Sequence, residues 1–267
     1  MRMRKGTRQS IELRSGPFVG SGALPAFLIA LAAAAALLAT VALTACAGSL
    51  AATLRPDGSA ALSIQAEIPA PLAARFRALS GGGRKDAKPL PLFDEGAIRE
   101  SVAKRPYLTI TSLSAPSLDS LRAEIAIRKV ADLAEAEEIK KSGLLSLTSG
   151  PGWTELRIHL ERDGASASIA LFPGIDPYLI DALSPPALED EPLSADEYRM
   201  NLRTILASAM PAMETAALTV SLAAPGAVLS SGGGSLAGNV LTARIPIIDA
   251  LVLDKPIEFW IRWKSGQ

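Results

Sequence analysis

The sequence predicts an α+β fold: an antiparallel sheet of hairpin-connected strands with helices packed on one face, preceded by a signal or anchor segment. Three observations predict it. Several segments alternate apolar and polar residues with a period of two, which is typical of half-buried strands. Turn sequences lie between some of these segments, which favours hairpins. Helical segments are inserted without any regular alternation of strand and helix, which favours α+β over a parallel α/β sheet.

The first 46 residues have the three parts of an export signal. The basic residues of the leader are Arg2, Arg4, Lys5, Arg8 and Arg14, against one acid, Glu12. An apolar run then extends over residues 23–45, and it ends at Cys46, the only cysteine of the chain. No charged residue occurs between Arg14 and Arg55. This pattern predicts export from the cytoplasm.

Residues Leu43, Thr44 and Ala45 followed by Cys46 resemble the lipobox of bacterial lipoproteins. The resemblance implies that a diacylglyceryl group is attached to Cys46, that residues 1–45 are removed as a signal peptide, and that palmitate-type acyl chains hold the protein to a membrane. Two alternatives stay open. An apolar run of this length can span a bilayer of ~30 Å as an uncleaved helix, and an ordinary cleaved signal has a similar pattern.

Composition and the residue after Cys46 indicate where the mature chain lies. Ala47 follows the cysteine, at a place where an aspartate would retain many lipoproteins in the inner membrane. Its presence resembles the pattern of outer-membrane lipoproteins, so we expect a lipid-anchored protein of the bacterial cell envelope that faces the periplasm. Residues 46–267 carry 22 basic and 26 acidic side chains. This mild negative balance argues against a nucleic-acid partner, which usually needs a concentrated basic face.

The domain organisation predicted for the exported chain is simple. Residues 46–50 form the lipidated cysteine and a short tether, and residues 51–267 form a single α+β envelope domain. The length suffices for one large domain, and no internal repeat is visible. The loops at 80–92 and 184–193 are candidate boundaries, but the strands on either side are expected to share one sheet.

The first half of the domain is expected to contain strands and helices in alternation with turns. The turn at 55–59 contains Pro-Asp-Gly and joins an apolar stretch to a strand at 60–68 as a hairpin. Proline at 69 and 71 opens a helix at 72–79. Acidic residues in the first turn favour a helix at 93–104. Strands follow at 107–113 and 121–130, and a helix at 131–141 ends at Gly143.

The second half begins with the clearest strand, 153–160, in which every second residue is apolar. The turn at 162–164 is expected to lead into a partner strand at 166–172, giving a hairpin. A helix is expected at 177–183. Ser194 and Glu197 form a capping-box pattern that announces a long helix to about residue 209. Strands are expected at 217–222, 240–245 and 257–264, with a short helix at 248–253 and a glycine-rich loop at 230–235.

No residue is predicted to be catalytic, and no metal or cofactor is predicted. His159 is the single histidine, on the polar face of its strand, so clusters of cysteine and histidine for zinc or iron are excluded. The glycine-rich stretch before Arg84 and Lys85 lacks the spacing of a phosphate-binding loop. The acidic triplet at 189–191 reads as solvated residues. A site made of carboxylates alone stays open, but without aromatic platforms we expect no enzyme.

The two ends of the mature chain resemble the LppM-like family of bacterial envelope lipoproteins. The residues that carry the resemblance are the lipobox cysteine, the Pro-Asp-Gly-Ser turn between two strands at 54–68, Ala-Pro-Gly-Ala-Val at 224–228, Gly-Asn at 238–239 and Ile-Pro-Ile at 245–247. The resemblance implies an α+β body with a hydrophobic groove for lipid or lipoglycan, and no catalytic residues. The chain ends at Gln267 without the second membrane-spanning helix of that pattern.

Two functions are therefore expected, both without catalysis. In the first, the anchored body binds a lipid or another amphiphile in a groove between sheet and helices, because many inward apolar residues face few polar groups. In the second, the protein is a structural or adaptor lipoprotein that docks envelope protein partners through an exposed apolar patch around Trp260. The membrane is a partner in both, through Cys46.

Overall fold

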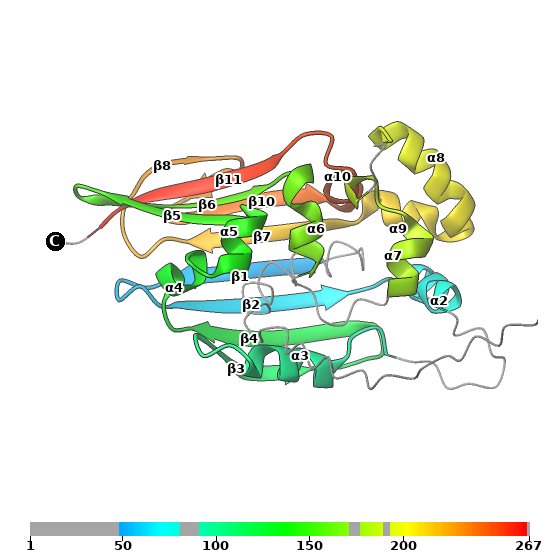
Figure 1. The fold of residues 1–267 in the computed structure, drawn as a ribbon, viewed down its shortest axis with the longest axis horizontal. Helices are drawn as coiled ribbons and strands as arrows, with labels where there is room; N and C mark the ends of the chain where they lie inside the picture. Colours follow the sequence, from blue (N-terminus) through cyan, green and yellow to red (C-terminus); the bar gives the residue numbers. More distant parts are fainter. Residues whose placement is uncertain (1–47, 81–90, 171–176, 189–192, 266–267) are drawn as a thin grey trace, which may run out of the picture.

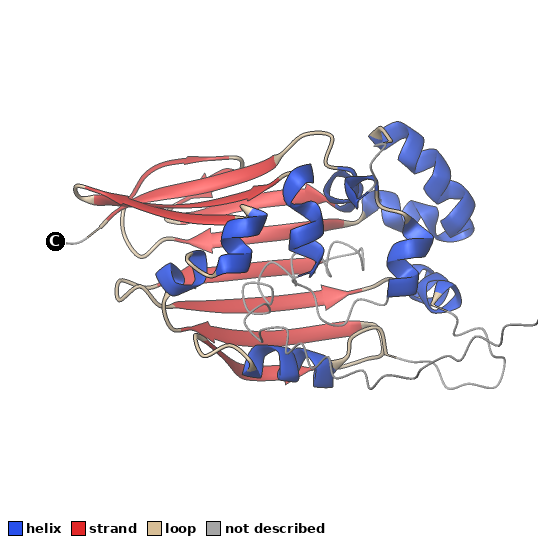
Figure 2. Ribbon diagram, viewed as in Figure 1, coloured by secondary structure: helices blue, strands red, loops and turns tan. Residues whose placement is uncertain are grey.

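The computed structural model of the chain describes residues 48–80, 91–170, 177–188 and 193–265. It is a mixed α+β structure with two sheets, which confirms the predicted fold class (Figures 1 and 2). Sheet A has the strand order β3 (Leu108–Ser114), β4 (Ser120–Ile127), β2 (Ala60–Glu67), β1 (Gly48–Leu54), β7 (Ala217–Ala223), β10 (Val240–Pro246) and β9 (Ser235–Ala237). Sheet B has the order β5 (Leu145–Gly150), β6 (Trp153–Leu160), β11 (Ile257–Lys264) and β8 (Val228–Gly232).

Strand β1 lies in the middle of sheet A, and its two neighbours run in different directions. It pairs antiparallel with β2 through the turn at 55–59, as predicted. On its other side it pairs in parallel with β7, from Gly48 opposite Leu218 to Thr53 opposite Ala223. The other strand pairs of the two sheets are antiparallel. The strand begins at Gly48, so residues 48–50, expected to belong to the tether, are part of the sheet.

The helices lie on one side of the sheets and at one end of them. Their bounds are α2 (Ala70–Leu79), α3 (Glu95–Ala103), α4 (Val130–Ala134), α5 (Glu137–Ser142), α6 (Arg162–Ala170), α7 (Pro177–Leu183), α8 (Ala195–Leu206), α9 (Met210–Thr215) and α10 (Ile247–Val252), with short 3₁₀ turns η1 (Pro186–Leu188) and η2 (Ala207–Ala209). Helices α4, α5 and α6 lie in front of the sheets, and α2, α7, α8 and α9 gather at the right-hand end (Figure 1).

Alternation of apolar and polar residues gives sheet A one buried face. In β2, Leu62 and Ile64 are almost fully buried, and the residues between them are partly exposed. The same pattern recurs in β4 and β7, where Ile125 and Val220 are buried. Because residues at alternate positions share a face, these side chains form one apolar surface under sheet B and the helices. The opposite face of sheet A carries small and polar side chains.

Several helix signals in the sequence are confirmed. The Ser194 hydroxyl and the Glu197 carboxylate form the capping box at the start of α8. The Asp94 carboxylate accepts a hydrogen bond from the backbone N–H of Ala97 at the start of α3. Gly143 has a φ of 65° and ends α5 in the left-handed conformation. The helix expected at 131–141 is broken into α4 and α5 around Glu135.

The prediction of a strand at 166–172 is wrong over its described part, because residues 162–170 form helix α6. Strand β6 has β5 on one side and β11 on the other, so no edge is left for a further partner. The alternation of serine and alanine in this segment also suits a helix, in which alanine is the most favourable residue. Strands β2 and β3, on either side of the loop at 80–92, share sheet A as expected, but β6 and β7, on either side of the loop at 184–193, belong to different sheets.

The glycine-rich loop expected at 230–235 contains parts of two strands. Strand β8 lies at the edge of sheet B and β9 at the edge of sheet A, so the chain changes sheets between them. Gly233 at this corner has a φ of 77°. A Cβ atom there would lie 2.0 Å from the carbonyl oxygen of Glu258, so the position has no room for a side chain.

Candidate apolar binding site

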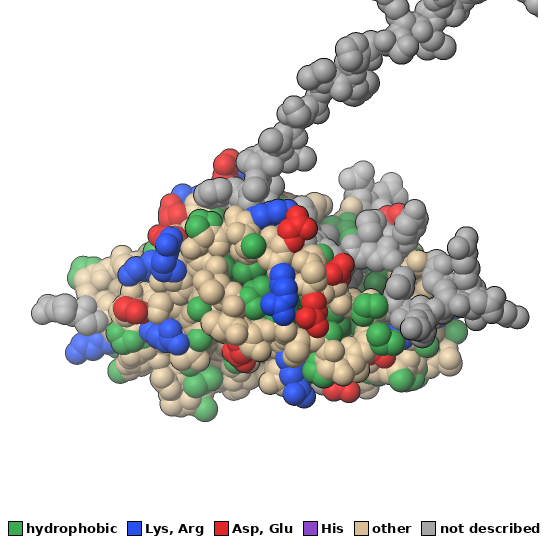
Figure 3. Space-filling view, turned by 90° about the horizontal axis from the view of Figure 1, so that it is seen from below, with side chains coloured by type: hydrophobic (Ala, Val, Ile, Leu, Met, Phe, Trp, Pro, Cys, Tyr) green, Lys and Arg blue, Asp and Glu red, His purple; other side chains and the backbone are tan. Residues whose placement is uncertain are grey.

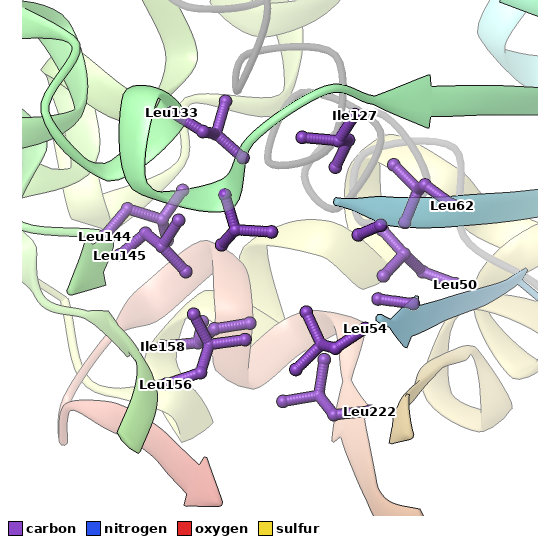
Figure 4. A pocket seen from close by; sticks show the side chains of 13 residues that line it. Leu50, Leu54, Leu62, Ile127, Leu133, Leu144, Leu145, Leu156, Ile158 and Leu222 are labelled. Carbon is purple, nitrogen blue, oxygen red and sulfur yellow. The ribbon is translucent and has the colours of Figure 1, made fainter. Parts of the chain in front are cut away.

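An apolar cavity of about 60 Å³ lies between the two sheets beneath α4 (Figure 4). Its described wall is made of Leu, Ile, Val and Ala side chains: Leu50, Ala52, Leu54, Ala60, Leu62, Ile127, Val130, Leu133, Leu144, Leu145, Leu156, Ile158 and Leu222. Ten of them are labelled in Figure 4, where they point toward a common centre. The wall formed by the described residues is therefore purely hydrocarbon.

The local sequence explains how these side chains come together. Strands β1, β2 and β7 contribute inward residues of sheet A, and β5 and β6 contribute inward residues of sheet B. In α4, Val130 and Leu133 are three residues apart, so both project from one side of this short helix onto the cavity. Helix α4 has five residues and no side-chain bond at its N-terminus, where the backbone N–H of Val130 donates a hydrogen bond to the carbonyl oxygen of Gly58.

The chemistry of this cavity is limited to hydrophobic contact. None of the described lining side chains carries nitrogen or oxygen, so these side chains offer water no hydrogen-bond partner. Ligand pockets commonly have about 300–1,000 Å³. In its present size the cavity accommodates only a few methylene groups, and a longer hydrocarbon chain requires α4 to move away from the sheets.

The residues predicted for lipidation lie outside the described part of the chain. These are Leu43, Thr44, Ala45 and Cys46, and the same holds for Arg84 and Lys85 and for the acidic triplet at 189–191. The described chain begins at Gly48, two residues after Cys46. No helix within the described ranges is long and apolar enough to cross a membrane. The described residues also contain no cluster of three or more metal-ligating side chains.

His159 lies between two carboxylates on the outer face of sheet B. Its Nδ1 is 3.1 Å from Glu258 Oε2, and its Nε2 is 3.2 Å from Glu161 Oε2. Arg157 also pairs with Glu258. No nucleophile is among these partners, so the contacts fit an ion-pair network on a strand surface.

The outer face of sheet B holds an arrangement of tryptophan and arginine that the sequence analysis missed. The guanidinium of Arg262 lies 4.3 Å from the ring centre of Trp153, and that of Arg157 lies 5.5 Å from the ring centre of Trp260. Each tryptophan lies opposite a glycine of an edge strand, Trp153 opposite Gly150 and Trp260 opposite Gly232. The paired glycine is the signal that could have indicated it.

This arrangement changes the expectation for Trp260. Its ring is partly buried, and a Cβ atom on Gly232 would lie 2.6 Å from the ring nitrogen, so the ring covers that glycine. Its other neighbours are the charged groups of Arg157 and Arg262. The surroundings of this tryptophan thus include two guanidinium groups and a glycine of the edge strand.

Glu155 is the buried charged residue in the middle of this face. Its side chain is 8% exposed and lies 3.0 Å from Arg157 and 2.8 Å from Arg262. Burial alone would raise the pKa of this carboxyl, but the hydrogen bonds from the two arginines outweigh burial and hold the pKa below its ordinary value. Glu155 is thus ionised at neutral pH and links β6 to β11.

Acidic and basic side chains mix on the face seen in Figure 3, which views the molecule from the side of α3 and β3. Lysine and arginine lie next to aspartate and glutamate, and no region of one sign dominates the visible described surface. This face has no concentrated positive charge of the kind that binds a nucleic acid.

Comparison with known proteins gives one distant structural likeness. No protein-family model and no curated protein sequence matches the chain. Among solved structures, the folded domain of LppM from Mycobacterium tuberculosis is similar with a TM-score of 0.38 and 12% sequence identity, over 83% of this chain and 90% of that domain. It belongs to the family that the two chain ends resemble.

Proposed function

We propose that this chain is a lipid-anchored, non-catalytic protein of the bacterial cell envelope whose folded body binds one hydrocarbon chain of an amphiphile between its two sheets. The observation that carries this proposal is the apolar cavity beneath α4, with its wall of hydrocarbon side chains. The anchor is Cys46, and the proposed location is the outer membrane, facing the periplasm.

The size of the cavity supports binding of a chain end and not of a whole lipid. A cavity that is too small for its ligand must widen, and the short helix α4 is the element that can move at low cost, since it buries only Val130, Leu133 and Ala134. A polar headgroup finds no partner within the cavity wall. The headgroup of a bound amphiphile would therefore stay outside.

Native mass spectrometry of the full chain, purified from its own membrane, tests this proposal. We expect an added mass that denaturation releases, distinct from the covalent acyl groups on Cys46. A chain that is always empty would overturn amphiphile binding and leave the cavity as an imperfection of core packing.

A variant that fills the cavity sharpens the test. Ala60 is 1% exposed and lines the cavity, so Ala60→Leu places three further carbon atoms in the empty space. We expect the added mass to disappear, with stability unchanged or raised by about 0.5–2 kcal/mol, as for other cavity-filling changes. Chemical unfolding measures the stability.

The matched control is Ala123→Leu on the neighbouring strand. Ala123 is equally buried, and it lies opposite Ile64 of β2 without lining the cavity. Leucine there overpacks the core, which costs about 1–3 kcal/mol, and the added mass should persist. If both variants lost the amphiphile alike, the cavity would not be its site.

One observation favours the adaptor function as a second candidate. Leu229 of β8 and Leu236 of β9 are 55% and 44% exposed, and they lie on either side of the corner at Gly233. Serine at both positions should abolish crosslinks to envelope proteins in cells if this corner docks a partner. Crosslinks that persist in that double variant would remove this candidate.

A further inference from the structure

A second hollow, of about 830 Å³, lies at the end of sheet A where β1, β4 and β7 begin and where β2 and β10 end. It shares no residue with the apolar cavity. In Figure 1 this is the right-hand end of the sheet, next to α2. Unlike the cavity, the hollow has polar and charged side chains in its wall beside apolar ones.

A row of side chains crosses five neighbouring strands of this hollow. The strand register places Arg122 opposite Gln65, Gln65 opposite Ser49, Ser49 opposite Thr219, and Thr219 opposite Arg244. Residues paired in this way project from the same face of a sheet. These five residues alternate along their strands with buried apolar residues, so they project from the outer face of sheet A.

The two arginines at the ends of the row have no carboxylate partner in the described part of the chain. None of the ion pairs between described residues involves Arg122 or Arg244. Arg244 makes one long hydrogen bond, to the carbonyl oxygen of Thr215 at 3.4 Å. Among the described residues of the wall, Glu67 is the one acidic residue. The hollow thus presents two outward guanidinium groups with hydroxyl and amide groups between them.

The spacing of the arginines indicates the kind of anion. Strands β4 and β10 are separated by β2, β1 and β7, so their backbones are about 19 Å apart at the usual spacing of neighbouring strands. Two separate phosphate groups, held side by side on one surface, can contact the two ends of such a row, one at each arginine.

The position of Cys46 supplies the surface. Gly48 lines the hollow, and two residues of extended chain span at most about 7 Å. Acyl chains on Cys46 would hold this end of sheet A next to the headgroups of the lipid layer. This step rests on the lipid anchor of the proposed function.

We propose that the hollow at the end of sheet A binds the phosphate groups of anionic phospholipid headgroups in the membrane that holds Cys46. Arg122 and Arg244 each contact one phosphate, and Ser49, Gln65 and Thr219 donate hydrogen bonds between them. The bound headgroups fix this end of sheet A against the membrane, so that the body does not turn freely on its tether.

Photocrosslinking with the full chain in vesicles tests this. The vesicles are phosphatidylcholine with a trace of a probe lipid that carries a photoactivatable headgroup, either phosphatidylglycerol or phosphatidylcholine. Peptide mapping should find the phosphatidylglycerol probe on the peptides that contain Ser49 and Gln65, in excess over the phosphatidylcholine probe. Equal labelling by the two probes would overturn the proposal.

The variants Arg122→Gln and Arg244→Gln should each lower this excess about fivefold, and together about 25-fold. One basic residue near an anionic surface strengthens binding about fivefold. The control is the double variant Arg55→Gln and Arg128→Gln. Arg55 and Arg128 are exposed, and each directly follows its strand, β1 or β4, at the end away from the hollow. The control therefore changes the net charge of the chain by the same amount as the double variant in the hollow. An equal loss in the control would also overturn the proposal.

The test separates this proposal from the anchor on which it rests. The mass of the chain from its own membrane reports acylation of Cys46 independently. An acylated chain without preference for phosphatidylglycerol contradicts the headgroup site alone. A chain without acyl groups that still shows the preference contradicts the anchor alone.

Discussion

At the scale of single residues, Glu155 is the buried charge on which the outer face of sheet B depends. Arg157 and Arg262 both donate hydrogen bonds to it, and the same two arginines lie against the rings of Trp260 and Trp153. Removal of the carboxylate would leave two guanidinium groups close together without their shared partner, although both are about one third exposed. Water therefore compensates part of the loss.

We expect Glu155→Gln to lower the free energy of unfolding at neutral pH by about 1–3 kcal/mol, since hydrogen bonds to charged groups contribute this much. Urea unfolding measures it. The control is Glu135→Gln, whose carboxylate pairs with Lys140 and is 71% exposed. Such a surface pair contributes at most about 1 kcal/mol. Equal effects of the two variants would contradict the structural role of Glu155.

The pH dependence of stability follows from the lowered pKa of Glu155. In the unfolded chain, the carboxylate of Glu155 takes up a proton near the ordinary glutamate pKa of 4.5. In the folded chain it does so at a lower pH. The stabilisation by this carboxylate is thus fully present well above 4.5 and is lost as the pH falls through the folded value. The parent chain should lose more stability on acidification than Glu155→Gln, measured by urea unfolding across this range.

At the scale of elements, the corner between β8 and β9 joins the edges of the two sheets. Gly233 combines a positive φ with close approach to the backbone of Glu258 and Phe259. Gly238, a few residues later, has a φ of 61°, but a Cβ atom there would meet no other atom within 4 Å, so it has the same backbone requirement in open space. A side chain at Gly238 would therefore meet only conformational strain, whereas a side chain at Gly233 would meet conformational strain and steric clash.

We expect Gly238→Ala to cost about 1 kcal/mol for the left-handed conformation alone. Gly233→Ala should cost clearly more, because the new methyl group would force the corner away from β11. Thermal unfolding of both variants measures the difference. Equal losses would mean that the sheets shift freely at this corner.

Elements with local signals could be predicted from the sequence, and elements decided by distant partners could not. Ser194 and Glu197 specify the start of α8 within four residues, and the alternation in 60–68 specifies β2. The strand predicted at 166–172 failed because both edges of β6 are taken by other strands, one of them far away in the sequence. The cavity was predictable only as an apolar groove, since its wall joins residues as distant as Leu50 and Leu222.

At the scale of the whole molecule, the proposed headgroup site lies at the end of sheet A where the described chain begins, two residues after Cys46. The apolar cavity and the polar hollow use opposite faces of that sheet, because side chains alternate along β1, β2 and β7. One sheet thus separates a hydrocarbon site from a phosphate site. The sequence predicted the anchor and not the hollow, because the row from Arg122 to Arg244 exists only through strand pairing.

Cys46→Ser tests the anchor directly. The thiol is the acceptor of the diacylglyceryl group in the proposed lipoprotein, so we expect the variant to lack the mass of the acyl groups and to keep residues 1–45. Mass spectrometry and membrane fractionation measure both. The control is Ala51→Ser, an exposed position of β1 outside the lipobox. A variant at residue 46 with the mass and fractionation of the parent chain would contradict acylation.

The parallel pairing of β1 with β7 has a consequence for biogenesis. Gly48 must meet Leu218, a residue 170 positions later, before the central strand of sheet A has both neighbours. Contacts this distant along the chain slow folding. In the export proposed for this chain, the N-terminus would cross the inner membrane first, so this sheet would be completed only after most of the chain had followed, and until then the edge of β1 would stay available to periplasmic chaperones.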